Sequence, residues 1–150
     1  MRDVPPAPDI EEAVAFPEDG GCFGCSAANA AGLQLRFRRR GARVMADCRI
    51  ADRFHGAPGI VHGGIVATLL DEISCAAAVF TRDRRVVTGE LSVRYRRPCP
   101  VETPLRLSAE VTDAAHPRYL VIAAEVRAGD ELLACSTSKF FVAAGGVTAP

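Results

Sequence analysis

The sequence predicts an α+β domain in which one curved antiparallel sheet of about six strands surrounds a single long central helix. Residues 63–80 carry apolar side chains around nearly the whole circumference of a helix, and a helix of that kind is buried. The other apolar segments alternate with the period of a strand and are joined by short links, which favour antiparallel pairing. A sheet curled around the helix satisfies these observations.

The elements follow one another simply along the chain. Residues 33–38 alternate apolar and polar side chains, and a second strand-like segment at residues 43–50 follows across Gly41, so the two should form a hairpin. A loop at residues 51–61 leads into the helix. Four further strands are predicted after the helix, at residues 87–95, 105–111, 119–126 and 132–142.

The two ends of the chain have a different composition from the middle. Residues 1–21 are rich in Pro, Gly and acidic residues, which indicates a flexible lead-in with a short helix around Ile10–Ala15. Residues 143–150 read as a frayed tail. A single domain is therefore expected at residues 22–142.

Composition and charge exclude several classes of protein. Hydrophobic residues make up 49% of the chain, as in globular domains, and the net charge of zero gives no bulk attraction to nucleic acid or to anionic membranes. The longest apolar run, Ile65–Phe80, is interrupted by Asp71 and Glu72, so no membrane span is expected. Because the N-terminus has no apolar signal-peptide core, we expect a cytoplasmic location and reduced cysteines.

The most informative segment is Gly59–Glu72, which joins a His62-Gly63-Gly64 turn to the start of the helix. Glycines at a helix start expose backbone N–H groups, and the helix dipole favours negative charge there. A carboxylate inside an apolar helix, here Asp71, is costly unless it is paired or used. An oxyanion stabiliser and a base are the two catalytic groups that acyl-transfer chemistry requires at minimum.

The spacing of these groups predicts a site shared between two subunits. His62 and Asp71 are separated by about 900° of helical rotation and about 13 Å of rise, which places them on opposite sides of the helix. Asp71 is therefore poorly placed to meet its own Gly63 turn. It could meet the turn of a second protomer across a two-fold axis, which gives two equivalent sites.

The chain resembles the hotdog-fold thioesterase superfamily, in its phenylacetate-degradation-type (PaaI-like) branch. The resemblance spans roughly residues 22–142. An isolated His-Gly-Gly would be unspecific, whereas His-Gly-Gly with an acid nine residues on and a threonine-bearing strand is a specific combination. The segments that carry the resemblance are Cys22-Phe23-Gly24-Cys25, Asn29, Gly32-Leu33, Pro58-Gly59-Ile60-Val61-His62-Gly63-Gly64, Leu69-Leu70-Asp71-Glu72, Val87-Thr88 and Val93-Arg94-Tyr95-Arg96-Arg97-Pro98.

The resemblance implies an acyl-CoA thioesterase that works as a dimer or tetramer, with no metal and no cofactor besides the CoA of its substrate. The Gly63 N–H, helped by Gly64, would hydrogen-bond the thioester carbonyl. Asp71 of the partner subunit would activate water or attack the carbonyl directly. By the family match, Thr88 would orient the water or Asp71, and His62 would fix the turn.

Two further groups of residues are candidates for substrate binding. His55 and Gly56 stand in the loop where many relatives carry an Asn or Gln that assists the carbonyl, so His55 is either a substitute donor or a solvent-facing residue. Arg94, Arg96 and Arg97, with Arg82, Arg84 and Arg85 as a second group, are candidates for the CoA phosphates or are simply solvated.

Glu72 projects about 100° away from Asp71 and is expected to be a structural or interface acid. Cys22 and Cys25 have metal-pair spacing, but a structural zinc needs four ligands and no second pair follows, so a structural role is favoured. The remaining cysteines (Cys48, Cys75, Cys99 and Cys135) suit buried positions.

Two functions compete with thioester hydrolysis. A non-catalytic acyl-binding module would have no need of Asp71 inside an apolar helix. A hotdog dehydratase or hydratase usually pairs a histidine with an acid acting on carbon, and the pattern here fits that chemistry less well. The acyl group, and CoA against a carrier protein, stay open.

Overall fold

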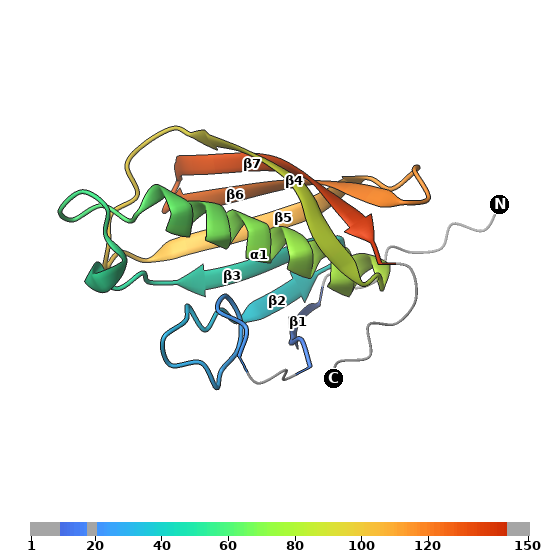
Figure 1. Cartoon of the computed structure of the whole chain (residues 1–150), viewed down its shortest axis with the longest axis horizontal. Helices are drawn as coiled ribbons and strands as arrows, with labels where there is room; N and C mark the ends of the chain where they lie inside the picture. The colour runs from blue at the N-terminus through green and yellow to red at the C-terminus, as the bar shows by residue number, and fades with distance from the viewer. Residues whose placement is uncertain (1–9, 18–20, 144–150) are drawn as a thin grey trace.

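The computed structural model describes residues 10–17 and 21–143. One helix, α1 (Gly63–Arg82), lies against one face of an antiparallel sheet (Figure 1), and the only other helical piece in the described residues is a 3-10 turn at Asp52–Phe54. The sheet order is β1-β2-β3-β5-β6-β7-β4. The strands are β1 (Glu11–Val14), β2 (Phe37–Arg40), β3 (Arg43–Cys48), β4 (Val86–Tyr95), β5 (Leu105–Asp113), β6 (Tyr119–Ala128) and β7 (Glu131–Val142).

This arrangement confirms the predicted fold class and most of the predicted elements. The α1 helix packs against β2 to β7, and its buried side chains meet the inward side chains of the sheet. The helix ends at Arg82, two residues later than predicted. The next residue, Asp83, caps it with a left-handed φ of 50°. The core is built from residues such as Val66, Leu69, Leu70, Ile73, Val44, Leu107, Ile122 and Phe140.

The N-terminal segment differs from the prediction. The expected helix around Ile10–Ala15 is wrong, because Glu11–Val14 forms β1 and pairs antiparallel with β2. The strand predicted at residues 33–38 is interrupted because Gln34 adopts a left-handed φ of 51°, so β2 begins only at Phe37. Leu35 and Phe37 are nevertheless both buried, as the alternation predicted.

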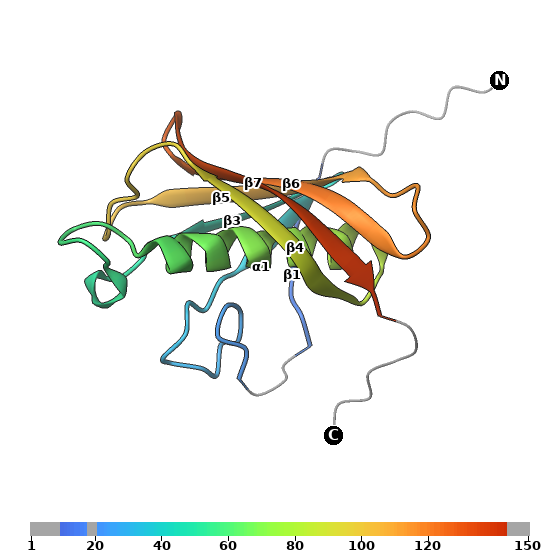
Figure 2. The ribbon, with the colours of Figure 1, turned by 45° about the horizontal axis from the view of Figure 1, so that its top comes forward.

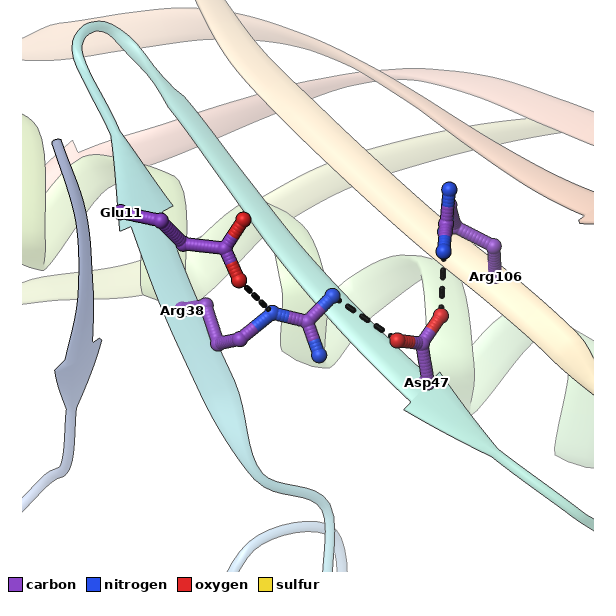
Figure 3. A network of polar contacts seen from close by, with 4 residues as sticks. All are labelled: Glu11, Arg38, Asp47 and Arg106. Carbon is purple, nitrogen blue, oxygen red and sulfur yellow. Dashed lines mark hydrogen bonds and ion pairs between the residues drawn. The ribbon is translucent and has the colours of Figure 1, made fainter. Parts of the chain in front are cut away.

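A chain of ion pairs on the outer face of the sheet ties β1 to its neighbours (Figure 3). Arg38 Nε lies 2.5 Å from Glu11 Oε1, Arg38 Nη2 lies 2.8 Å from Asp47 Oδ2, and Arg106 Nε lies 3.0 Å from Asp47 Oδ1. Partial burial opposes ionisation of Asp47, but hydrogen bonds from Arg106 and Arg38 outweigh it and lower the pKa of this carboxyl. The network thus links β1, β2, β3 and β5.

The apolar character of α1 corrects one expectation. By length and composition the helix could cross a membrane, with a mean hydropathy of 1.6, so Asp71 and Glu72 interrupt the run less than we expected. A single such helix is weak evidence for a span, because the core helix of a folded domain passes the same test. Here the helix packs on the sheet and contributes to the core.

Candidate active site

The start of α1 is closed by a histidine cap. His62 is the N-cap residue, and its Nδ1 accepts a hydrogen bond from the Gly64 N–H at 2.9 Å. Because an N–H can only donate, Nδ1 carries no proton, and the neutral ring presents Nε2–H as a donor. His62 therefore fixes the turn as expected and leaves one outward-facing donor.

The cap changes what the two glycines can offer. The N–H of Gly64 is already used by His62, so the expected help from Gly64 at an oxyanion is not available in this arrangement. The N–H of Gly63 has no hydrogen-bond partner among the described residues. Gly63 is thus the donor that the helix start leaves for a ligand.

Tyr95 is a site residue that our sequence reasoning passed over. Its hydroxyl donates to the carbonyl oxygen of Gly63 at 2.7 Å, and the side chain reaches this position from the end of β4. Tyr95 is 53% exposed although it contacts the turn. The signal was present, since Tyr95 lies within the motif Val93–Pro98, but only the three-dimensional contact assigns it to the turn.

The loop before α1 folds back onto His62. The His62 N–H bonds the Phe54 carbonyl at 2.9 Å, and His55 forms a bridge with Val61. A Cβ added to Gly56 would lie 3.2 Å from His62 Cα, so the absence of a side chain at Gly56 permits the close approach. His55 and Gly56 therefore lie beside the turn, as the resemblance led us to expect.

His55 is held in the opposite tautomer from His62. Its Nδ1 lies 2.6 Å from the Asp52 carbonyl oxygen, which can only accept, so Nδ1 carries the proton. In the neutral ring Nε2 is then an acceptor. A neutral His55 cannot replace an Asn or Gln as a donor through Nε2, which weighs against that alternative.

Asp71 and Thr88 meet where β4 crosses α1, and Figure 2 shows β4 passing alongside the helix. The Thr88 hydroxyl donates to Asp71 Oδ1 at 2.8 Å. Asp71 is half-buried, and its other carboxylate oxygen stays available as an acceptor. Of the predicted site residues, the structure thus joins these two in one contact.

A bulge in β4 explains how Thr88 reaches the helix. Thr88 pairs with Phe140 and Glu90 pairs with Lys139, so Gly89 is an extra residue in this strand. Phe140 is buried against α1, and cross-strand partners point to the same face, so Thr88 also points to the helix. In a regular strand without the bulge, Gly89 would lie opposite Phe140 and Thr88 would point to the outer face.

Gly89 is required for this geometry, because a Cβ there would lie 2.2 Å from the ring of Phe141. A glycine inside a strand is a signal for a bulge, and it could have been recognised in the sequence.

The two halves of the candidate site are separated within one chain. Gly63 and Asp71 are eight residues apart on α1, which is about 12 Å along the axis. Tyr95 marks one half and Thr88 the other, seven residues apart on the same strand.

The predicted arginines do not gather at either half. Arg94 pairs with Cys135 on the face opposite to that of Val93 and Tyr95, so it points away from α1. Arg97 forms an ion pair with Glu131 at 2.7 Å, and the Arg96 side chain is exposed. A contact of these arginines with a substrate phosphate stays a prediction.

An open hollow of about 790 Å³ lies elsewhere, near the ends of β3 and β5 and the β6–β7 turn. None of the predicted site residues lines it. Its lining residues are Asp47, Cys48, Arg49, Pro104, Leu105, Arg106, Gly129 and Asp130. The hollow therefore does not coincide with the candidate site.

The six cysteines are free thiols, and burial affects several of them. None of the six, all of which lie within the described residues, takes part in a disulfide. Burial raises the pKa of Cys48 and of Cys75 to about 12 and that of Cys99 to about 11. Burial, followed by the neighbouring Cys22 and Glu72, raises the pKa of Cys25 far above its ordinary value. The buried thiols of Cys48, Cys75 and Cys99 are therefore protonated at neutral pH and are poor nucleophiles.

Comparison with known proteins gives the family. Residues 58–135 match the model of the thioesterase superfamily, which is just over half of this 150-residue chain. The chain therefore belongs to the thioesterase superfamily, and its hotdog-type fold agrees with the resemblance drawn from the motifs.

Similar proteins include acyl-coenzyme A thioesterases. THEM4 from Xenopus laevis is 30% identical over 76 residues, which are 51% of this chain and 33% of that protein. THEM4 from Bos taurus is 31% identical over 78 residues, which are 51% of this chain and 30% of that protein. The matched region thus spans about a third of the length of these curated relatives.

Solved structures support the fold. A thioesterase superfamily protein aligns with a TM-score of 0.71 and 27% identity, over 77% of this chain and 57% of that chain. A second, from Shewanella loihica PV-4, aligns with a TM-score of 0.63 and 27% identity, over 73% of this chain and 91% of that one. A phenylacetic acid degradation-related protein from Ralstonia eutropha JMP134, at 21% identity with a TM-score of 0.66 over 73% and 86% of the chains, shares the fold.

Proposed function

We propose that this protein hydrolyses a thioester of CoA or of an acyl carrier, with two active sites shared across a homodimer. The observation that carries the proposal is the contact of Thr88 with Asp71 at 2.8 Å, which holds an acid in place inside an apolar helix. Similarity to acyl-coenzyme A thioesterases over about half of the chain supports the same chemistry.

Each half of the site would supply one part of the reaction. The Gly63 N–H of one protomer would donate to the thioester carbonyl, where negative charge develops in the transition state, and a donor of this kind contributes about 3 kcal/mol in other enzymes. Asp71 of the partner protomer would activate water or attack the carbonyl, with Thr88 holding its carboxylate or the water. Free acid and free thiol are the products, and the reaction needs no metal or cofactor.

The exposed edge of β4 supports the dimer. Most of β4 is exposed on both faces, and Val87 and Tyr95 are apolar or aromatic side chains at 58% and 53% exposure. A two-fold axis near the middle of this edge would bring Asp71 of one protomer toward Gly63 of the other, closing a separation of about 12 Å. Assembly into a dimer of dimers is compatible with this pairing.

The test is release of thiol from a panel of acyl-CoAs, short aliphatic through aromatic, followed with a thiol-reactive dye. Asp71→Asn should lower kcat by about 10² to 10⁴-fold, because it removes the base and keeps the shape. Asp130→Asn, which removes a carboxylate in the β6–β7 turn, is the matched control and should behave as wild type. Wild-type release that survives in Asp71→Asn would show that another group is the base.

Absence of release by the wild type from every acyl-CoA would direct the next assay to acyl-carrier-protein substrates. If those also gave no thiol, a non-catalytic acyl-binding module would replace the proposal. Water addition to an enoyl thioester without thiol release would instead identify the hydratase chemistry.

A further inference from the structure

Three metal-ligating side chains meet at a place that the proposed reaction does not use. Cys22, Cys25 and Glu72 bring two sulfurs and a carboxylate oxygen within 4.8 Å of one another, all half-buried. They form the one group of this kind among the described residues. Cys22 Sγ lies 3.8 Å from Glu72 Oε1 across fifty residues of sequence. The sequence analysis weighed Cys22 and Cys25 as a metal pair and favoured a structural role, and the fold adds the Glu72 carboxylate from α1 to these two thiols.

The loop that carries the two cysteines is fixed by its backbone. The Ser26 N–H bonds the Cys22 carbonyl at 3.1 Å, which closes the turn. The N–H groups of Leu33 and Leu35 bond the carbonyls of Phe23 and Gly24 at 2.8 and 2.9 Å. Both sulfurs are therefore held in place before any ligand arrives, which lowers the entropic cost of binding.

Gly24 shows that the turn is shaped around the carboxylate. A Cβ added there would lie 2.2 Å from Glu72 Cδ and 2.6 Å from Glu72 Oε1. Gly24 is buried, so a side chain could not be turned toward solvent without moving the loop or Glu72. The approach of Glu72 to the two sulfurs thus depends on a glycine between them.

The spacing of Cys22 and Glu72 is compatible with one cation between them. Tetrahedral zinc with the usual bond lengths places a sulfur ligand and an oxygen ligand about 3.6 Å apart and two sulfur ligands about 3.8 Å apart. The 3.8 Å between Cys22 Sγ and Glu72 Oε1 is within a few tenths of that value.

We propose that Cys22, Cys25 and Glu72 bind one Zn²⁺ ion, with a solvent molecule as fourth ligand, and that the ion fixes the residue 22–35 loop to α1. Two sulfurs and one carboxylate select a borderline-soft cation such as zinc over calcium or magnesium. Because Glu72 projects about 100° away from Asp71, the ion would stabilise the helix next to the base without touching the reacting carbonyl.

The first measurement is metal content of the full chain, purified under reducing conditions and loaded with Zn²⁺, then freed of excess metal by gel filtration. We expect about one zinc per chain, since the three ligands form one site. Co²⁺ in place of zinc should give thiolate-to-cobalt charge-transfer absorption, a signature that only sulfur ligation produces. Zinc should also raise the melting temperature, because it binds the folded chain preferentially.

The variants separate this site from adventitious binding. Cys25→Ser should abolish the charge-transfer band, and Glu72→Gln should weaken zinc binding at least 10-fold while keeping a weaker band. Cys135→Ser removes an isolated thiol on β7 and should retain full binding. Circular dichroism of each variant without metal shows whether it folds, so that loss of binding is not confused with loss of structure.

Two results would overturn the inference. One is reduced wild-type protein that holds no zinc and gives no charge-transfer band with Co²⁺. The other is equal metal binding by Cys25→Ser and Cys135→Ser, which would indicate adventitious surface sites. Formation of a Cys22–Cys25 disulfide in air, with no metal bound after reduction, would assign the pair to redox chemistry instead. Since none of these measurements uses thioester hydrolysis, failure of the proposed function would not affect the outcome.

Discussion

The two edges of the sheet are built in opposite ways. At the β1 edge the side chains are charged and matched, with Arg38 joined to Glu11 and Arg39 Nε lying 3.8 Å from Glu12 Oε1. At the β4 edge Val87 and Tyr95 are exposed, and a bulge interrupts the register. Both candidate half-sites, at Gly63 and at Asp71, lie along β4 and neither lies near β1.

The difference indicates which edge of the sheet is suited to pair with a second chain. Charged side chains on an edge strand discourage pairing with another chain, whereas exposed apolar and aromatic side chains such as Val87 and Tyr95 favour it. The fold protects the edge that carries no candidate chemistry and leaves open the edge that carries all of it. The predictions below test this contrast.

The largest effect is expected from a charge placed on the β4 edge. Val87→Lys should convert the dimer to a monomer and remove most thioesterase activity, because the lysine blocks edge pairing and separates the two halves of each site. Light scattering coupled to gel filtration measures the assembly, and thiol release measures activity.

Ile10→Lys is the matched control, since Ile10 is 66% exposed next to β1. It should leave both assembly and activity as in the wild type. A Val87→Lys dimer with full activity would refute pairing through β4.

The next effect concerns the hydroxyl that contacts the acid. Thr88→Val keeps the shape of the side chain and removes the hydrogen bond to Asp71, and a hydrogen bond to a charged group is worth about 1.5–3 kcal/mol. Activity should therefore fall by about 10 to 100-fold, with the assembly unchanged. Thr88→Ser, which retains the hydroxyl, should recover most of the activity in the same assay, and equal loss in both variants would mean that the methyl group matters more.

A smaller effect is expected at the other half-site. Tyr95→Phe removes the hydrogen bond to the Gly63 carbonyl and should lower kcat by about 5-fold, as loss of about 1 kcal/mol predicts. Steady-state kinetics should show the change mainly in kcat, because the turn would be less firmly placed for the transition state. A change confined to KM would indicate that Tyr95 serves ground-state binding instead.

The smallest effect is expected from the ion-pair network on the β1 side of the sheet. The pKa of Asp47 is lowered, so its contribution to stability is present above the ordinary carboxyl value of about 3.9 and is lost as the pH falls through the lowered value. Because Asp47 is partly exposed, we expect about 0.5–1 kcal/mol. Urea unfolding at pH 7 should find Asp47→Asn less stable by this amount, and the difference should shrink as the pH falls through the lowered pKa of Asp47. A difference that persists in acid would have a cause other than charge.

Much of the fold was predictable because its signals are local. The apolar run of α1 and the alternation of β5, β6 and β7 each appear within one short segment. The segment Glu11–Val14 was misassigned because its strand character comes from pairing with β2, a contact that local composition does not encode.

The candidate site also combines residues that local motifs reveal with contacts that only the fold reveals. The His62-Gly63-Gly64 turn and Asp71 were found from local motifs, and Thr88 came from the family resemblance. The contact of Tyr95 with Gly63 spans thirty-two residues and that of Cys22 with Glu72 spans fifty. Contacts between residues so far apart in sequence depend on tertiary packing. The sequence therefore shows these residues but not that they lie next to one another.

The position of β4 also has a consequence for how the chain folds. Within the sheet β4 is held by one neighbour, β7, which is the last of the described strands in chain order. Until Glu131–Val142 has been synthesised, Val86–Tyr95 lacks its strand partner in the sheet. The core helix is therefore synthesised well before the strand that holds Thr88 and Tyr95 in place, so the candidate chemistry forms later in folding than the helix that carries Asp71.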